Sequence, residues 1–294
     1  MTALRALLTG IVDYAGLFPP ASLDMPTAVS NFRSYENDPS SWMLGRFVVP
    51  VARLGELRDA VAAMAVGPRQ PMRLTVVLGT DVENDVATVR ASTSAHGRSF
   101  AADMLEAKFA TASSIERAAA VVGSEFELFA ELPIDSDPLA LIQAVTRSGI
   151  SAKVRTGGVT LDAFPLAANV VRFMRRCLDA GVRFKATAGL HHPLRAEYPL
   201  TYEQTSPRGV MFGYLNVFLA AAFMSDGMRD TDAERLLDER DPTSFSIGED
   251  HIEWREHAVS AERLAEMRAH GATSFGSCSF REPADELYAL SIRN

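Results

Sequence analysis

The segment that decides the fold is residues 151–190, which read SAKVRTGGVTLDAFPLAANVVRFMRRCLDAGVRFKATAGL. It contains a short β-rich run at 151–157, an amphipathic helical stretch at 161–180 and a second β-rich run at 183–190. Helices repeat apolar residues every three or four positions, whereas short runs rich in Val, Thr and Phe are typical of strands. The order strand, helix, strand predicts a β–α–β unit with parallel strands.

The same alternation continues toward both ends of the chain and gives eight candidate strands. Eight strands alternating with helices predict an α/β fold of the closed (β/α)8 type, a TIM barrel. A doubly wound sheet is the alternative, but no Gly-x-Gly-x-x-Gly follows the first strand. The candidate strands are residues 11–17, 46–51, 73–79, 103–109, 127–132, 151–157, 183–190 and 274–280.

The interval between the seventh and eighth strands, residues 197–257, is too long for one loop and one helix. Its apolar stretch at 210–224 is shorter than the ~20 residues that a membrane span needs, so it predicts a buried helix and leaves room for a homo-oligomer contact. We interpret the interval as an elaborated segment within a single domain covering 1–294, since no linker rich in Pro, Gly or Ser divides the chain.

Composition excludes several classes of protein. An apolar content of 47% excludes a disordered chain, and two cysteines exclude a disulfide scaffold. The net charge of −8 argues against a nucleic-acid partner, because phosphate binding needs a basic face. No secretion signal is evident at the N-terminus, so the expectation is a cytoplasmic protein without a membrane partner.

Lysine usage is the most informative detail of the composition. Nearly all of the 29 lysine and arginine residues are arginines, and the lysines are Lys108, Lys153 and Lys185. Each falls near the C-terminal end of a predicted strand, where barrel enzymes carry their active sites. Lysine can lose its proton and attack a carbonyl group, which arginine cannot do.

The alternation of side chains along a strand predicts which residues share the inward face of the barrel. These are Lys108 with Glu106, Lys153 with Arg155, Lys185 with Thr187, and Glu131 on the fifth strand. Buried charges must be paired, so one interpretation is an ion-pair cluster that only stabilises the barrel. The other is a Schiff-base site, where two cations, Arg155 and Lys185, outweigh one carboxylate, Glu106, beside a nucleophilic Lys153.

Three motifs resemble the class I aldolases of the deoxyribose-phosphate aldolase type. They are Lys153-Val154-Arg155-Thr156-Gly157, Phe184-Lys185-Ala186-Thr187-Ala188-Gly189 and Phe275-Gly276-Ser277-Cys278-Ser279. The resemblance implies a (β/α)8 barrel without a cofactor, in which Lys153 forms the Schiff base and Lys185 perturbs it. The proton-relay carboxylate on the fourth strand of that family is best matched by Glu106. Asp103 is a weaker match in another alignment of the strand.

Departures from the motifs affect the expected substrate. Ala188 replaces the first of two glycines, and Glu282 after the eighth strand would repel a phosphate. We therefore expect an aldolase or other lyase acting on a small carbonyl compound that is not a sugar phosphate. Substrate contacts are predicted for Lys108, Glu131, Arg155, Thr156, Thr187, His191 and Ser277.

Two alternatives to this function stay open. A metal-dependent lyase or hydrolase would use His191 or His192 with Glu131, although no His-x-His spacing supports it. A barrel without chemistry would serve as a binding protein. Cys278, by its parity on the last strand, is expected to pack rather than react.

Overall fold

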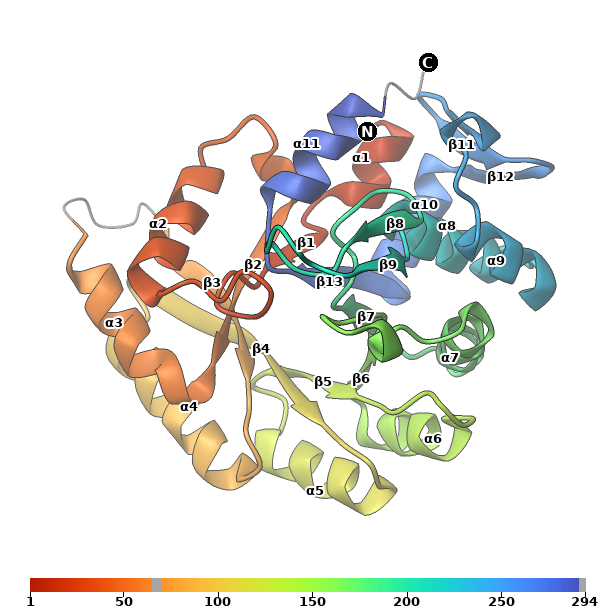
Figure 1. Cartoon of the computed structure of the whole chain (residues 1–294). Helices are drawn as coiled ribbons and strands as arrows, with labels where there is room; N and C mark the ends of the chain where they lie inside the picture. The colour runs from red at the N-terminus through yellow and green to blue at the C-terminus, as the bar shows by residue number, and fades with distance from the viewer. Residues whose placement is uncertain (65–69, 291–294) are drawn as a thin grey trace.

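The computed structural model describes residues 1–64 and 70–290. Eight parallel strands close into a barrel in the order β1-β13-β7-β6-β5-β4-β3-β2 (Figure 1). This confirms the predicted (β/α)8 architecture, and each candidate strand overlaps an observed one. The barrel strands are β1 (Val12–Tyr14), β2 (Leu44–Pro50), β3 (Met72–Val77), β4 (Phe100–Lys108), β5 (Glu127–Glu131), β6 (Ser151–Arg155), β7 (Phe184–Thr187) and β13 (Ala272–Ser277).

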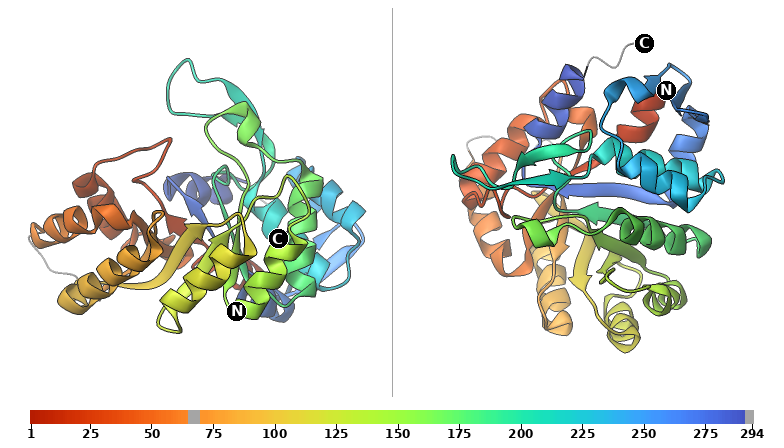
Figure 2. Two further views of the ribbon diagram at one scale, coloured as in Figure 1. Left: turned by 90° about the horizontal axis from the view of Figure 1, so that it is seen from below. Right: turned by 45° about the vertical axis from the view of Figure 1, so that its right-hand side comes forward.

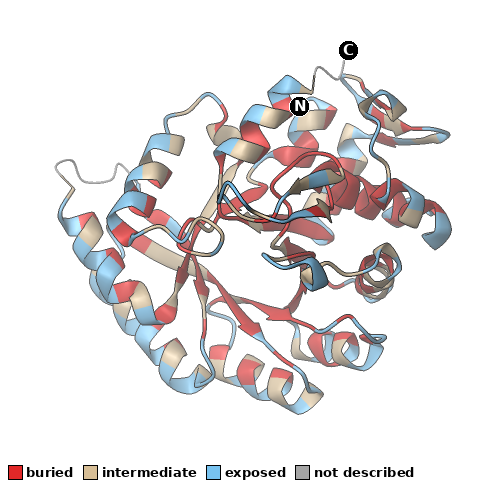
Figure 3. Ribbon diagram, in the orientation of Figure 1, coloured by how far each residue is buried: buried red, intermediate tan, exposed pale blue. Residues whose placement is uncertain are grey.

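A layer of helices surrounds the barrel. In Figure 3 these helices are buried on the side that faces the strands and exposed on the outside, as amphipathic sequences require. Side chains at the N-caps, for example Asp24 and Thr111, accept hydrogen bonds from backbone N–H groups of the first turn. The helices between the barrel strands include α2 (Met25–Tyr35), α3 (Leu54–Ala62), α4 (Val82–His96), α5 (Ala112–Val122), α6 (Leu139–Ser148) and α7 (Ala167–Asp179), with α1 (Ala3–Leu8) before β1 and α11 (Arg281–Ala289) after β13.

The segment between β7 and β13 is elaborated, as expected. It begins with a hairpin that projects away from the barrel (Figure 2) and continues through helices and a small antiparallel sheet. Its elements are β8 (Ala196–Pro199), β9 (Arg208–Met211), α8 (Tyr214–Ser225), α9 (Asp230–Leu237), β10 (Phe245–Ile247), β11 (His251–Trp254), β12 (His257–Ser260) and α10 (Ala261–His270).

The apolar stretch at 210–224 is not one helix. Its first residues belong to β9, and α8 begins after Gly213. Every residue of α8 from Tyr214 to Met224 is buried within this chain, as expected for a buried helix. The amide of Asn216 donates to the carbonyl oxygens of Leu236 and Glu239, which satisfies its buried polar group. In the described part of the chain, no helix is long and apolar enough to cross a membrane.

The barrel register aligns charged residues from four neighbouring strands. Lys108 of β4 is the Cα partner of Glu131 of β5, which pairs in turn with Lys153 of β6. Lys153 is the partner of Lys185 on β7. The row lies at or near the carboxyl ends of these strands, the side where (β/α)8 enzymes bind substrates.

Candidate active site

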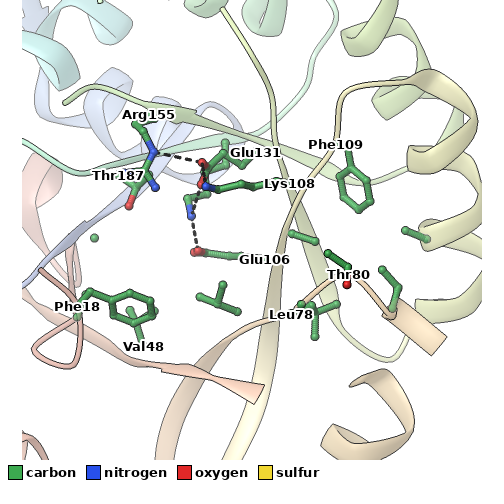
Figure 4. A pocket seen from close by; sticks show the side chains of 18 of the residues that line it. Phe18, Val48, Leu78, Thr80, Glu106, Lys108, Phe109, Glu131, Arg155 and Thr187 are labelled. Atoms are coloured by element: carbon green, nitrogen blue, oxygen red, sulfur yellow. Dashed lines mark hydrogen bonds and ion pairs between the residues drawn. The ribbon is translucent and has the colours of Figure 1, made fainter. Parts of the chain in front are cut away.

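A cavity of about 820 Å³ opens at the carboxyl ends of the barrel strands (Figure 4). Its wall contains residues from β4, β5, β6, β7 and β13, and from the loop after β1. Most of the predicted site residues reach this wall. They are Glu106, Lys108, Glu131, Lys153, Arg155, Thr187 and His191.

Lys153 lies in the cavity wall with 7% of its side chain exposed. Its Nζ is 2.6 Å from Oε2 of Glu106 and 2.8 Å from Oε2 of Glu131. Lys153 therefore borders the cavity while two carboxylates contact its amine, and either of them is placed to exchange a proton with it.

Lys185 lies beside it and is almost completely buried. Its Nζ is 2.5 Å from Oδ2 of Asp13 and 2.6 Å from Oε1 of Glu106. Burial alone would lower the pKa of Lys185, but the charge of Asp13 and then that of Glu106 raise the pKa above its ordinary value. Lys185 does not line the cavity and remains a cation behind it.

Glu106 bridges the two lysines, with one carboxylate oxygen on each amine. Burial alone would raise its pKa, but the charge of Lys153 and then that of Lys185 hold the pKa of Glu106 at about 2. This carboxylate is therefore ionised throughout the neutral range.

The other cationic partners of Glu131 lie farther from its carboxylate than Lys153 does. Its Oε1 is 3.3 Å from Nε of Arg155 and 3.8 Å from Nζ of Lys108, both of which are well exposed. Burial would raise the pKa of Glu131, but Lys153 first, and then Arg155 and Lys108, lower it. Lys108 and Arg155 thus stand at the entrance, where solvent screens their charges.

The charge balance around the two buried amines differs from the sequence-based expectation. We expected a single carboxylate, Glu106, to oppose two cations at Lys153. The structure places three carboxylates, Asp13, Glu106 and Glu131, in direct contact with Lys153 and Lys185. An excess of positive charge at Lys153 is therefore not what this site provides.

Two predicted substrate contacts lie behind the cavity wall. Thr156 is fully buried, and its Oγ1 donates to the carbonyl oxygen of Ala188 at 2.7 Å, which ties the ends of β6 and β7 together. Ser277 is also buried, with Oγ 3.2 Å from Nδ1 of His191. Thr156 and Ser277 therefore do not line the cavity themselves but contact Ala188 and His191, which do.

The weaker match for the relay carboxylate, Asp103, lies elsewhere. Its carboxylate accepts hydrogen bonds from Arg46 of β2 and Arg73 of β3, and it does not line the cavity. Among the two candidates on this strand, Glu106 is the one that contacts the lysines.

His191 brings a second group of polar side chains into the wall. Its Nδ1 is 3.2 Å from Oε2 of Glu282 and 3.9 Å from Sγ of Cys278. Burial alone would lower its pKa, but Cys278 and Glu282 raise the pKa of His191 to about 10. The ring is therefore an imidazolium at neutral pH. Cys278, although buried, also lines the cavity.

His192 points away from this group. Its Nδ1 is 2.9 Å from Oε1 of Glu286, and its ring stacks on Tyr198 with centroids 3.4 Å apart. The metal hypothesis pairs His191 or His192 with Glu131. His192 contacts Glu286 instead, whereas His191 and Glu131 both line the cavity. Within residues 1–64 and 70–290, no group of three or more His, Cys, Asp or Glu side chains is arranged to hold a metal ion.

Sequence reasoning missed three contributors to the site. Asp13 could have been noticed, because it is a charged residue inside the apolar first strand. Its partner Lys185 could not be predicted, because the two residues are far apart in the sequence. Glu282 was considered only as a repulsive charge, whereas it contacts His191. Tyr202, at the end of the β8–β9 hairpin, donates to Glu282 at 3.1 Å and carried no signal at all.

The fold and the cavity together define a (β/α)8 barrel with a buried lysine–carboxylate cluster at the carboxyl ends of its strands. Comparison of the sequence with protein-family models gave no match, and neither did comparison with curated proteins.

Proposed function

We propose that the chain is a lyase of the class I aldolase type, in which Lys153 forms a Schiff base with a carbonyl substrate. One observation carries the proposal. Of the two buried lysines, Lys153 lines the cavity and Lys185 does not. The amine that meets a substrate is therefore that of Lys153, while the neighbouring amine of Lys185 stays charged.

The first step needs a neutral amine. The Lys153 ammonium gives a proton to a carboxylate, its nitrogen lone pair adds to the carbonyl carbon, and a second proton moves from nitrogen to oxygen to give a neutral carbinolamine. The carboxylic acid then returns its proton to this hydroxyl group, which leaves as water while the nitrogen lone pair forms the iminium ion on Lys153.

The iminium ion withdraws electrons from the bond between the α and β carbons. Removal of the proton from a hydroxyl group on the β carbon breaks this bond, releases an aldehyde and leaves an enamine. Protonation of the enamine carbon and hydrolysis by water then return the second carbonyl product and free Lys153. Arg155 and Lys108 at the entrance, and the imidazolium of His191, are available to bind oxygen atoms of the substrate.

The two carboxylates that contact Lys153, Glu106 and Glu131, differ as proton acceptors. When Lys153 becomes neutral, Glu106 still has the Lys185 ammonium at 2.6 Å, which keeps it ionised. Glu131 then retains only Arg155 and Lys108, at longer distances and with more solvent around them. Glu131 is therefore the better proton acceptor, and Glu106, our sequence-based choice for the shuttle, holds the two amines in place.

A non-catalytic barrel is the second candidate, because every carboxylate and amine of the cluster has a partner. Such complete pairing is also what a purely stabilising cluster requires. In that case replacement of Lys153 would change stability and leave ligand binding unaltered.

Reductive trapping separates the two candidates. The protein is treated with borohydride and a panel of small aldehydes and 2-oxo acids, and the labelled peptide is mapped. The proposal predicts that the label is on Lys153 and that it is absent in Lys153→Met. Lys108→Met, which removes a lysine at the cavity entrance, is the control and should still be labelled. A label on Lys185, or a substrate turned over without any label, overturns the assignment.

A further inference from the structure

The cavity wall has an apolar part that the proposed chemistry does not use. In Figure 4, Leu78 and Phe109 lie on the opposite side of Glu106 and Lys108 from Arg155 and Thr187. We call this apolar part the α4–α5 arm. Its apolar lining residues are Val77, Leu78, Val82, Phe109, Ala118 and Val121, and the polar residues Thr80, Asp81 and Glu83 border it.

The arm reaches from the barrel mouth into the helix layer. Val77 and Phe109 lie at the ends of β3 and β4, whereas Val82 begins α4 and Ala118 and Val121 belong to α5. Residues of the helix layer and Lys153 of the barrel interior therefore border one continuous cavity.

One face of α5 forms much of the arm. Ser114, Arg117, Ala118 and Val121 all line the cavity, and their spacing places them on a single side of the helix. From Ser114 to Val121 this face is about 10 Å long, given the rise of an α-helix per residue. Ala118 and Val121 make its C-terminal half apolar, while Ser114 and the exposed Arg117 make its N-terminal half polar.

The size of the cavity also exceeds what the lysine cluster needs. Its volume of about 820 Å³ lies in the upper part of the range that encloses drug-sized ligands. A carbonyl compound of a few carbon atoms at Lys153 would leave the arm empty or filled with water, against apolar side chains that gain nothing from it.

We propose that the α4–α5 arm binds the aliphatic chain of the substrate, which is then a medium-chain aliphatic carbonyl compound. The identity of the reacting group rests on the proposed function, because the carbonyl is assigned from Lys153. The binding of the chain does not, since it depends only on the apolar wall. This inference replaces the small compound expected from the sequence with a longer one.

Binding of unreactive n-alkanols tests the arm without using the chemistry of Lys153. Butanol, hexanol and octanol are titrated into the full chain by calorimetry. Each added methylene group should tighten binding about fourfold, which corresponds to about 0.8 kcal/mol. Equal affinities along the series would overturn the proposal.

Substitutions that fill the arm provide the matched controls. Val121→Phe blocks it from α5 and Val82→Phe blocks it from α4, and both should abolish the dependence on chain length. Ala120→Phe places the same ring on an exposed position of α5 and should retain it. If one blocking variant fails to fold, the dependence of alkanol affinity on chain length can still be measured in the other. Chain-length dependence that survives in a folded blocking variant shows that the chain binds elsewhere and refutes the arm.

Trapping with aldehydes of matched length distinguishes the two proposals. Octanal should be trapped on Lys153 at lower concentration than propanal, and Val121→Phe should remove that difference while propanal trapping persists. Alkanol binding with the expected chain-length dependence but no trapping of any aldehyde supports the arm and contradicts the Schiff base. Trapping that is indifferent to chain length supports the Schiff base and contradicts the arm.

Discussion

Lys153 and Lys185 are register partners on β6 and β7, and the single carboxylate of Glu106 contacts the amines of both at 2.6 Å. Beyond this shared contact their surroundings differ. Lys185 has Asp13 behind it and no access to the cavity, whereas Lys153 has Glu131 beside it and the cavity in front. Lys185 is thereby held as a buried cation, whereas Lys153 borders the cavity.

Glu106→Gln should lower the free energy of unfolding by about 3 kcal/mol, because it removes the buried anion shared by two buried cations. The amide keeps the shape of the side chain, so the loss reports charge and not packing. Urea unfolding at neutral pH measures it. Glu116→Gln, which disturbs only the surface pair with Arg147, should cost about 0–1 kcal/mol. A cost for Glu106→Gln as small as that of Glu116→Gln would contradict the arrangement.

Acid should remove the contribution of Glu106 in a defined pH window. Its pKa is about 2 in the folded protein against an ordinary value of 4.5, so the stabilisation is complete above about pH 4.5 and is lost as the pH falls toward 2. The shift corresponds to about 3 kcal/mol. In urea unfolding at a series of pH values, the difference between the wild type and Glu106→Gln should therefore shrink in this window. A difference that stays constant down to pH 2 contradicts the prediction.

The fold was accessible to sequence reasoning because its signals are local. Strand and helix periodicity identified every barrel strand, and the scarcity of lysine drew attention to Lys153 and Lys185. Side-chain alternation is also local, but it holds only inside a strand. Lys108 shares the parity of Glu106, yet β4 ends at Lys108, whose side chain is 75% exposed at the entrance.

The partners of these residues were not accessible in the same way. The contacts of Lys185 with Asp13, and of His191 with Glu282, join segments that are far apart in the chain and depend on how the barrel closes. The alternation of side chains along a strand predicts that a charged residue faces inward, but it does not predict which carboxylates contact which amines. The prediction of excess positive charge at Lys153 was wrong for that reason.

His191 should remain protonated through the neutral range. Its pKa is raised from 6.5 to about 10, so the stabilisation from its charged contacts is complete below about pH 6.5 and is lost as the pH rises through 10. NMR of the imidazole signals should show no titration of His191 between pH 5 and 8. Glu282→Gln removes one of the groups that raise the pKa and should move the titration to lower pH. A midpoint near 6.5 in the wild type would contradict the prediction.

Ala188→Gly should stabilise the protein by up to about 1 kcal/mol. Ala188 has a φ of 62°, in the left-handed region that costs an alanine more than a glycine. This is also the position where the aldolase-like motif would have a glycine. Ala186→Gly in the middle of β7 is the matched control and should destabilise by about 1 kcal/mol, because glycine weakens a strand. Thermal unfolding of the two variants measures the contrast. Equal effects at the two positions would show that the backbone at Ala188 carries no strain.

Glu131→Gln should slow Schiff-base formation by about 10²- to 10⁴-fold at neutral pH, the usual contribution of a general base. The amide cannot accept the proton of Lys153, and Glu106 is a poor substitute because Lys185 keeps it ionised. The amine must then lose its proton to hydroxide, so the rate in this variant should rise with pH toward that of the wild type. Arg155→Met, which removes a weaker partner of Glu131 from the entrance, is the control and should retain most of the rate. The rates come from trapping with cyanoborohydride at a series of pH values. Glu131→Gln with an unchanged rate at neutral pH would transfer the role of base to Glu106.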